Sequence, residues 1–408
     1  MLQWLIFVSG RNASPFNLFS ESKIWIDAFT AHYLSGRPFH ELETFLGKTS
    51  RHFQEYLQHP AHHPYWQQLR FSPADYRGFD IPILTLAGQY DDAQRGSLFY
   101  LAEHERHSGA KNHYAVIGAW DHGGTRSADQ YVGGADFGAP ATIDLNQLHL
   151  EWYDWVMKGG PPPAFLQDRI AYYVTGSNVW QYANSFTQLG SEKLNLYLAS
   201  NEQANDVTHS GILQPDLPDS RFAFADNFTF DPRDTRIAEL EQTPFTNWLT
   251  DQRYDLNLFG NGLVYHTAPF ETDVTLGGYV KLKLWIQMDV PDADFQATLA
   301  EIAPDGSYLK LTEDLFRARY RDGEDREVFS QPDEINCYEL KAFTYFARQI
   351  KKGSRLRLVV KCPNSIYLQK NYHSGGNVDN ESITDARAAH ITLFHDEKHP
   401  SLLELPLI

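Results

Sequence analysis

The 408-residue sequence contains little cysteine: only Cys337 and Cys362 occur. They allow at most one disulfide, exclude a four-cysteine zinc site and leave the redox compartment open. No apolar run approaches the length of a membrane-spanning helix. No cluster of Lys or Arg offsets the net charge of −17, which comes from 35 basic and 52 acidic residues. Binding to nucleic acid or to an anionic membrane is therefore not expected.

The first ten residues, MLQWLIFVSG, lack a basic leader and a small-residue cleavage site. They do not have the pattern of a signal peptide, and they are more typical of the middle of a folded element. The compartment stays open between cytoplasm and export, because a signal peptide would precede Met1. Apolar residues are plentiful, at 42% with 14% aromatic, which is enough for the buried cores of two domains and argues against disorder.

Three segments with different patterns follow one another. Residues 1–75 have apolar side chains at helical spacing and predict a helical region. Residues 76–163 contain two short apolar runs, IPILTLAG and NHYAVIGAW, with a helical pattern between them. This order predicts a strand–helix–strand unit with a parallel sheet. Residues 164–408 consist of short alternating runs between turns, which predicts an all-β sandwich or jelly roll, with the boundary near 160–168.

Polar side chains follow both apolar runs of the strand–helix–strand unit. Asp91 and Asp92 come directly after the first, and His122 follows the second. Working groups in open α/β sheets lie beyond the carboxyl ends of the strands. An acid followed by a histidine matches the second half of the order Ser…Asp…His, in which the histidine is a base and the carboxylate orients it. Alternatively, these are ordinary loop residues; Asp92 is the better helix cap and Asp91 the better catalytic acid.

A nucleophile is not evident. Residues 1–90 contain no Gly-x-Ser-x-Gly elbow. Ser9 and Ser14 lie in SGRNASPF, but neither is flanked as an elbow requires, and Ser14 is only a weak substitute.

Several stretches together resemble the cocaine-esterase/X-Pro dipeptidyl-peptidase (CocE/NonD) family of serine hydrolases. These stretches include FDIPILTLAGQYDDAQRG, NHYAVIGAWDHGG, LHLEWYDWVMKGG and, further on, PDADFQATLAEIAPDGSYLKLTEDL and AHITLFHDEKHPSLLELPL. The resemblance implies an α/β-hydrolase fold, present in its C-terminal part with a helical cap over residues 1–75, followed by a jelly-roll domain. It implies that Asp91 is the triad acid and His122 the triad base, acting on a small-molecule ester or amide, with X-Pro dipeptidyl-peptidase-like specificity as one expectation.

The family's serine elbow and oxyanion-hole tyrosine would lie upstream of the residues present, so we expect the chain as given to be inactive or nearly so. Asp92, Ala93 and Gln94 stand where members that hydrolyse α-amino-acid esters carry extra carboxylates, so an ammonium-selecting pocket is disfavoured. An incomplete sheet would expose an apolar edge, which predicts poor solubility or dimerisation, that is, a homo-oligomer.

Two other classes of function stay open: a catalytically dead homologue that acts as a binding or scaffold protein, and a carbohydrate-binding β-sandwich. No cofactor or metal is expected. Two sets of side chains could suggest metal sites, but neither has the pattern of one. Pro60 and Pro64 argue against the regular helix that would align His59, His62 and His63, and Asp289, Asp292, Asp294 and Asp305 fit no calcium-loop signature and lie where turns between strands are expected.

Overall fold

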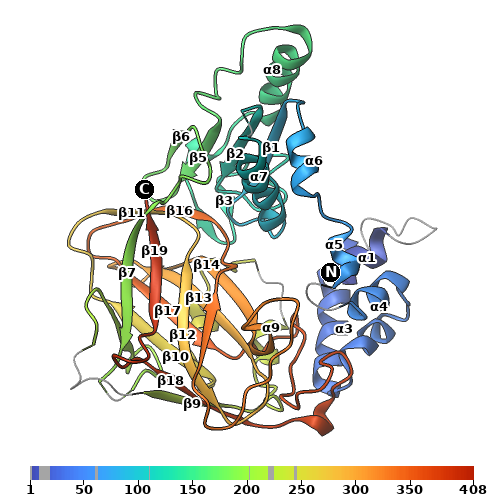
Figure 1. The fold of residues 1–408 in the computed structure, drawn as a ribbon, viewed down its shortest axis with the longest axis vertical. Coiled ribbons are helices and arrows are strands. Elements are labelled where there is room, and N and C mark those ends of the chain that lie inside the picture. The colour runs from blue at the N-terminus through green and yellow to red at the C-terminus, as the bar shows by residue number, and fades with distance from the viewer. Residues whose placement is uncertain are drawn as a thin grey trace.

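The computed structural model describes residues 2–8, 19–59, 63–109, 111–201, 203–218, 225–242 and 246–408. Ser9, Ser14 and His62 lie outside this part of the chain. Figure 1 shows a group of N-terminal helices, a small sheet with its own helices, and a large β-rich part. No helix in the described ranges is long and apolar enough to cross a membrane.

The first N-terminal helices are short and pack around a small apolar core of their own: α1 (Leu2–Val8), α3 (Ser22–Ser35), the 3₁₀ helix η1 (Phe39–Leu46) and α4 (Arg51–Leu57). α5 (Pro64–Gln67) follows them, and α6 (Pro73–Gly78) packs against α7 (Gln94–Ser108) of the small sheet. Leu5, Trp25 and Phe53 are buried in this core, as the helical spacing of the apolar residues predicts. α3 ends at Gly36, whose φ of 64° is left-handed and favours glycine.

The helical region is fastened to the β-rich part by the long loop 362–388. The Ile383 amide donates to the Gly36 carbonyl at 2.9 Å, and the His40 amide donates to the Asp379 carbonyl at 3.2 Å. A Cβ atom on Gly36 would lie 2.6 Å from the Ile383 Cβ, so the close approach of this loop also requires glycine.

The small sheet is mixed and has helices on both faces. Its strands are β1 (Ile83–Gly88), β2 (His113–Gly118), β5 (Ile170–Val174) and β6 (Val179–Ala183) in the order β1-β2-β5-β6. β1, β2 and β5 are parallel, and β6 is antiparallel to β5. α7 (Gln94–Ser108) places Leu98 and Leu101 against one face, whereas α8 (Leu145–Lys158) places Leu148 and Trp152 against the other.

Sheet pairing crosses the domain boundary that we predict near residue 164. The run RIAYYVTG contains β5, which the sequence analysis places in the β sandwich. In the structure β5 pairs in parallel with β2, so it extends the small sheet rather than the large one. β1 lies at the other edge, and its residues Ile83–Leu86 are only partly buried. The sequence predicts a strand buried on both faces, so β1 is more exposed than expected.

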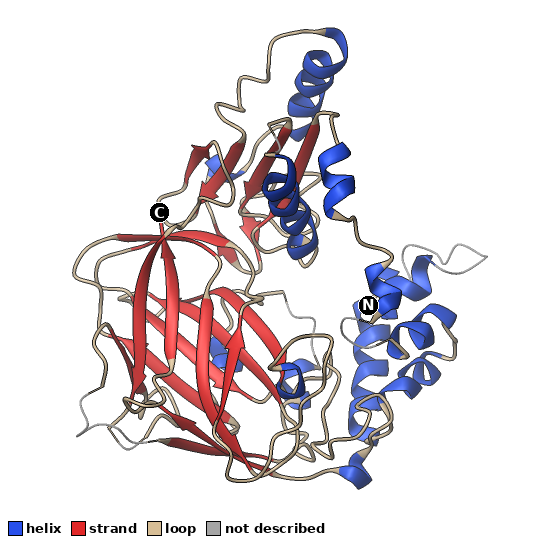
Figure 2. Ribbon diagram, in the orientation of Figure 1, coloured by secondary structure: helices blue, strands red, loops and turns tan. Residues whose placement is uncertain are grey.

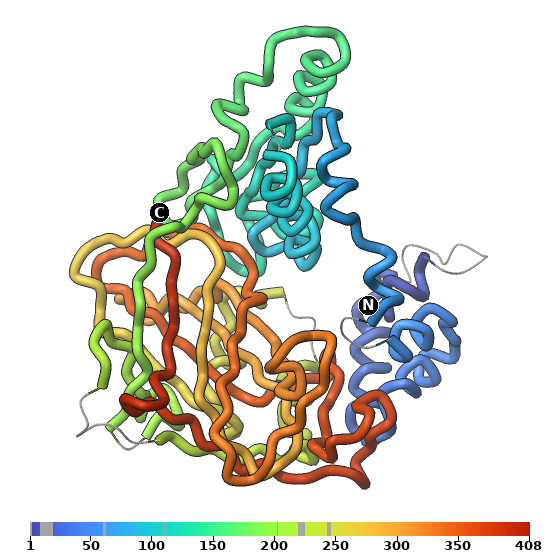
Figure 3. Tube along the Cα trace, in the orientation of Figure 1, coloured from blue at the N-terminus to red at the C-terminus, as the bar shows by residue number. Residues whose placement is uncertain are grey.

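The β-rich part encloses one large apolar core. The short hairpin β3 (Tyr131–Val132) and β4 (Ala135–Asp136) and the turn η2 (Ala139–Ala141) precede its strands in the sequence. Within the described residues, thirteen strands form one continuous network that is antiparallel apart from the parallel pair β8 and β10. Figure 2 and Figure 3 show these strands wrapped around the core, with few helices among them. The strands are β7 (Glu192–Ala199), β8 (Gly211–Gln214), β9 (Asp226–Phe230), β10 (Gly262–Thr267), β11 (Val274–Gly278), β12 (Lys281–Met288), β13 (Asp294–Ile302), β14 (Tyr308–Arg317), β15 (Asn336–Leu340), β16 (Phe346–Ile350), β17 (Arg355–Lys361), β18 (Ala389–Phe394) and β19 (Leu402–Leu407). The short helices are α9 (Ala238–Glu241), η3 (Gln252–Asp255), η4 (Ala318–Tyr320) and η5 (Ile383–Asp385).

Two buried glutamines join the small sheet to the β-rich part. The Gln89 side chain donates to the Tyr173 carbonyl at 2.5 Å and accepts from the Ala347 amide at 2.9 Å. The Gln94 side chain donates to the Tyr345 carbonyl and accepts from the Tyr345 amide, both at 2.8 Å. Each side-chain amide therefore satisfies backbone groups next to or within β16 that would otherwise be buried without a partner. Cys337 and Cys362 are both free, so no disulfide adds to this connection.

A buried histidine pair between α7 and β2 predicts a loss of stability in acid. His104 Nδ1 and His113 Nδ1 are 3.0 Å apart, and His113 Nε2 is 2.8 Å from the Thr85 hydroxyl. Burial, followed by the nearby His104 and Arg169, lowers the pKa of His113 from 6.5 to about 4. Between these values the unfolded state binds more protons. The free energy of unfolding therefore falls as the pH drops from 6.5 towards 4, by at most about 3 kcal/mol.

This dependence is measured by urea denaturation between pH 4 and pH 8. His113→Gln should flatten the slope below pH 6.5, whereas the exposed His390→Gln should leave it unchanged. Equal slopes in the wild type and His113→Gln would contradict the assignment.

Candidate active site

The chain turns sharply after β1 because backbone hydrogen bonds tie it to the end of β2. The Gln89 amide donates to the Gly118 carbonyl at 2.8 Å, and the Tyr90 amide donates to the Trp120 carbonyl at 3.0 Å. A Cβ atom on Gly88 would lie 2.1 Å from the Trp120 carbonyl oxygen, so only glycine allows the two strand ends to come this close. The loops after β1 and β2 therefore lie side by side.

The loop after β2 presents His122 to solvent. Asp121 caps this loop by accepting the Gly124 amide at 3.0 Å, and the Thr125 hydroxyl donates to the His122 carbonyl at 2.8 Å. Trp120 is fully buried beneath the loop and donates its indole N–H to the Ala141 carbonyl at 2.8 Å. Trp120 thus belongs to the core and holds the loop from below.

The structure brings Asp91 and His122 together. Asp91 Oδ1 lies 3.0 Å from His122 Nδ1. The Asp91 side chain is 5% exposed and that of His122 is 57% exposed. The same Asp91 oxygen accepts the Ala93 amide at 2.8 Å, which fixes the carboxylate. The histidine thus has one ring nitrogen against a buried acid and the other free to face a reactant, which is the arrangement a general base requires.

Asp92 does not cap α7, contrary to the sequence-based preference. The helix begins after Ala93, which makes no side-chain capping bond. Asp91 is the residue whose carboxylate accepts a backbone amide in this turn. Asp92 is exposed beside it.

A cavity of about 410 Å³ opens in front of His122, and the β-rich part forms its far wall. Trp248, Lys310 and Glu313 are among the lining residues that come from that wall. The Lys310 ammonium is 2.9 Å from the Glu313 carboxylate and 5.4 Å from the centre of the Trp248 ring. Sequence reasoning missed these residues, because nothing in their local patterns differs from ordinary strand and loop residues. Within the described part of the chain, no serine lines this cavity.

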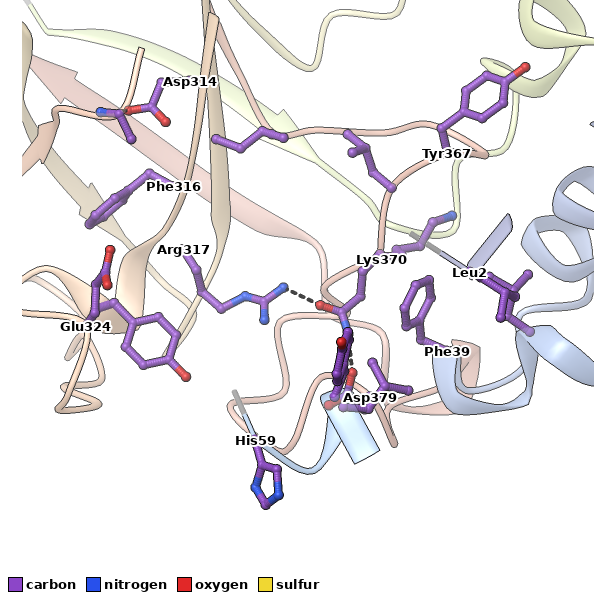
Figure 4. A pocket seen from close by; sticks show the side chains of 18 of the residues that line it. Leu2, Phe39, His59, Asp314, Phe316, Arg317, Glu324, Tyr367, Lys370 and Asp379 are labelled. Atoms are coloured by element: carbon purple, nitrogen blue, oxygen red, sulfur yellow. Dashed lines mark hydrogen bonds between the residues drawn. The ribbon is translucent and has the colours of Figure 1, made fainter. Parts of the chain in front are cut away.

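A larger cavity of about 930 Å³ lies between the helical region and the β-rich part and does not include the Asp91–His122 pair. Figure 4 shows Phe39, Phe316 and Tyr367 among its lining side chains. On its wall the Lys370 ammonium lies 3.8 Å from the centre of the Tyr33 ring and donates to the Pro232 carbonyl at 2.8 Å. Burial lowers the pKa of Lys370 to about 8.

The aspartates considered as a calcium site are engaged in other interactions. Asp292 is bound by Arg319 at 2.8 Å, and Asp294 is bound by Arg317 at 2.8 Å. Asp289 accepts the His390 amide, and Asp305 accepts the Ser307 amide.

The rings of His59 and His63 stack with their centroids 4.4 Å apart. Among the residues that the structure describes, the His, Cys, Asp and Glu donors that gather closely enough for a metal ion are those of Asp91, Asp92 and His122.

The model of the X-Pro dipeptidyl-peptidase C-terminal non-catalytic domain matches residues 157–404 of this chain, which is more than half of its length. The chain belongs to the cocaine-esterase/X-Pro dipeptidyl-peptidase family. Asp91 and His122 lie outside the matched segment. The family is one of hydrolases, so the chain is a member of a hydrolase family.

The relatives found by sequence and by structure agree with this assignment. A cocaine esterase from Rhodococcus sp. (strain MB1 Bresler) is 25% identical over 362 residues, which make up 86% of this chain and 60% of that protein. The crystal structure of an aminopeptidase from a marine sediment Thaumarchaeota archaeon has a TM-score of 0.79 at 19% identity, covering 93% of this chain and 63% of the other. An α-amino acid ester hydrolase structure has a TM-score of 0.79 at 18% identity, covering 93% of this chain and 64% of the other. These structures show a shared fold, and the chain spans somewhat less than two thirds of each relative.

The contact at Gly88 predicts that Gly88→Ala is strongly destabilising. The new methyl group would meet the Trp120 carbonyl, and relieving that overlap must separate the ends of β1 and β2. We expect a loss of about 2–3 kcal/mol in the free energy of unfolding, as for other overpacked sites.

Gly96→Ala is the matched control, because no atom lies within 4 Å of the added Cβ in α7. It should be neutral or stabilising by up to about 1 kcal/mol. Chemical denaturation followed by circular dichroism measures both changes, and equal stability of the two variants would refute the role of Gly88.

Proposed function

We propose that this chain carries the acid and base of a serine-type acyl hydrolase that acts on an ester or amide bond. The observation that carries the proposal is the 3.0 Å contact between the buried Asp91 carboxylate and the exposed His122 ring at the carboxyl ends of two parallel strands. The relatives, a cocaine esterase, an aminopeptidase and an α-amino acid ester hydrolase, all cleave such bonds.

His122 acts as a general base in this proposal, and Asp91 orients it. The neutral ring holds its proton on Nδ1, facing Asp91, so the lone pair on Nε2 removes the proton of the attacking hydroxyl. Asp91 stabilises the imidazolium that forms. The imidazolium then returns the proton to the leaving alcohol or amine, and water hydrolyses the acyl intermediate by the same route.

The proposed architecture has three parts. Residues 76–163, with β5 and β6, would form the C-terminal part of an α/β-hydrolase sheet, residues 1–75 its helical cap, and the rest of residues 164–408 a jelly-roll domain. The parallel order β1-β2-β5 with helices on both faces supports the first assignment. The match of the non-catalytic domain model to residues 157–404 supports the last.

We propose that the nucleophile lies outside the described residues, on Ser14 or on a further segment that completes the sheet at the free edge of β1. In the described part of the chain, the hydroxyls that line the cavity are those of Tyr90, Thr312 and Thr344. Thr312 donates to the Thr344 carbonyl at 2.8 Å, and the two threonine hydroxyls are 2.9 Å apart. Burial raises the pKa of Tyr90 to about 12. Among the described residues none of the three hydroxyls is hydrogen-bonded to His122, so none is activated as a nucleophile. These 408 residues would then have little or no hydrolase activity on their own.

That no serine is found among the described residues lining the cavity favours a second candidate, a homologue that binds ester- or amide-like ligands without cleaving them. In that case Asp91 and His122 would orient a ligand rather than activate a nucleophile. A serine label that depends on His122 would exclude this second candidate, whereas an unlabelled chain agrees with both.

The free edge of β1 predicts association at high concentration. Ile83–Leu86 are partly buried apolar and polar residues on an edge strand, and Ile81 beside them is 64% exposed. Such edges pair with other chains. Light scattering after size exclusion should show dimers or larger species that Ile81→Lys reduces, while Leu217→Lys, which is on the β-rich part and 48% exposed, does not. A monomer at all concentrations would argue against an open sheet.

A fluorophosphonate probe followed by peptide mapping tests the catalytic proposal in the full chain. We expect no labelled serine in this chain, or a label confined to Ser14. Any label that appears should disappear in His122→Gln and Ser14→Ala. A label that persists in His122→Gln would overturn the role of His122.

The pairing of Asp91 with His122 can be tested even if the probe labels nothing. NMR of ¹⁵N-histidine reports which ring nitrogen of His122 carries the proton. The wild type should hold its proton on Nδ1, and Asp91→Asn should shift the proton towards Nε2. The same tautomer mixture in both proteins would overturn the proposed pair.

A further inference from the structure

Three side chains at the end of the small sheet have donor atoms that lie within 4.8 Å of one another: Asp91, Asp92 and His122. The set combines two carboxylates with an imidazole, so it is more than an acidic cluster. An imidazole nitrogen adds a directional ligand with a preference for transition metals.

The distance between two of the donors is close to that in a zinc site. His122 Nδ1 and Asp91 Oδ1 are 3.0 Å apart. Two ligands of a tetrahedral zinc ion, each bonded at about 2.0–2.1 Å, are about 3.4 Å apart. A small rotation of the exposed His122 ring therefore makes room for a cation in place of the proton between these atoms.

The three donors differ in how firmly they are held, in a way that suits reversible binding. Asp91 is buried, and the Ala93 amide fixes its carboxylate. His122 and Asp92 are exposed, and no hydrogen bond or ion pair engages the Asp92 carboxylate in the described part of the chain. The adjoining cavity of about 410 Å³ has room for water ligands, and Asp121 on its wall adds negative charge, whereas the Glu313 carboxylate is paired with Lys310.

The geometry points to a divalent transition-metal site formed by Asp91, Asp92 and His122, which takes Zn²⁺ or Co²⁺. The mixed nitrogen and oxygen donors suit these ions, whereas Ca²⁺ and Mg²⁺ prefer all-oxygen shells. This differs from the expectation from sequence, which assigns no metal to the chain.

Metal binding would prevent His122 from acting as a base. When the cation takes Nδ1, the proton of the neutral ring moves through solvent to Nε2, and Nε2 can no longer accept a proton from an attacking hydroxyl. This consequence, unlike the binding itself, rests on the proposed hydrolase function. The site would therefore inhibit the hydrolysis that the same residues promote.

The test measures binding without relying on activity. The tag-free full chain is titrated with Co²⁺ by visible absorption and with Zn²⁺ by calorimetry, at pH 7.5. Asp92→Asn removes one ligand and leaves the Asp91–His122 contact in place, so binding should weaken at least tenfold, and His122→Gln should weaken it further.

Two controls locate the metal. Glu313→Gln removes a carboxylate from the same cavity but not from the ligand set, and His63→Gln removes the neighbour of His59; both should bind as the wild type does. Equal affinity in the wild type, Asp92→Asn and His122→Gln would overturn the site and would mean adventitious binding only. The NMR tautomer experiment on metal-free protein tests the catalytic pair separately, so the two proposals can fail independently.

Discussion

The placement of Asp91 depends on two buried glutamine side chains. Gln89 and Gln94 stand on either side of the acid, and each exchanges a pair of hydrogen bonds with backbone groups, three of the four in or beside β16. A neutral amide can both donate and accept hydrogen bonds. An ionised carboxylate can only accept and an ammonium can only donate, and either would bury a charge here. The turn that carries Asp91 is thereby fixed to the small sheet and to the β-rich part at once.

This attachment explains how two separate layers share one cavity. The small sheet supplies Asp91 and His122 at the ends of β1 and β2, and the β-rich part supplies Trp248 and Lys310 opposite them. Because the connection runs through the turn itself, a change in how the layers pack would move the acid relative to the cavity wall. Backbone contacts at Gly88 then set the separation of the two loops.

The contrast in exposure within the pair gives the site its chemistry. The buried Asp91 carboxylate is hydrogen-bonded to a backbone amide and to a ring nitrogen, so it has little freedom to rotate. The exposed imidazole of His122 is accessible to a proton or to a cation. The proton and the cation would compete for Nδ1 of His122, and this competition connects the proposed hydrolysis with the proposed metal site. A change at Asp92 distinguishes the two proposals, because Asp92 is one of the proposed metal ligands and is not part of the acid–base pair.

The order of patterns along the sequence determined much of this protein. Apolar runs at residues 81–88 and 113–120, with a helical segment between them, predict β1, α7 and β2, and the strand ends identify Asp91 and His122 as candidates. Periodicity and burial type are local properties, so local sequence reports them. Only the tertiary structure decided that β5 joins the small sheet, that Asp91 rather than Asp92 caps the turn, and that Trp248 and Lys310 face His122. Those outcomes depend on pairing between segments far apart in the chain, where packing and hydrogen bonding across layers select among arrangements that local patterns leave equally open.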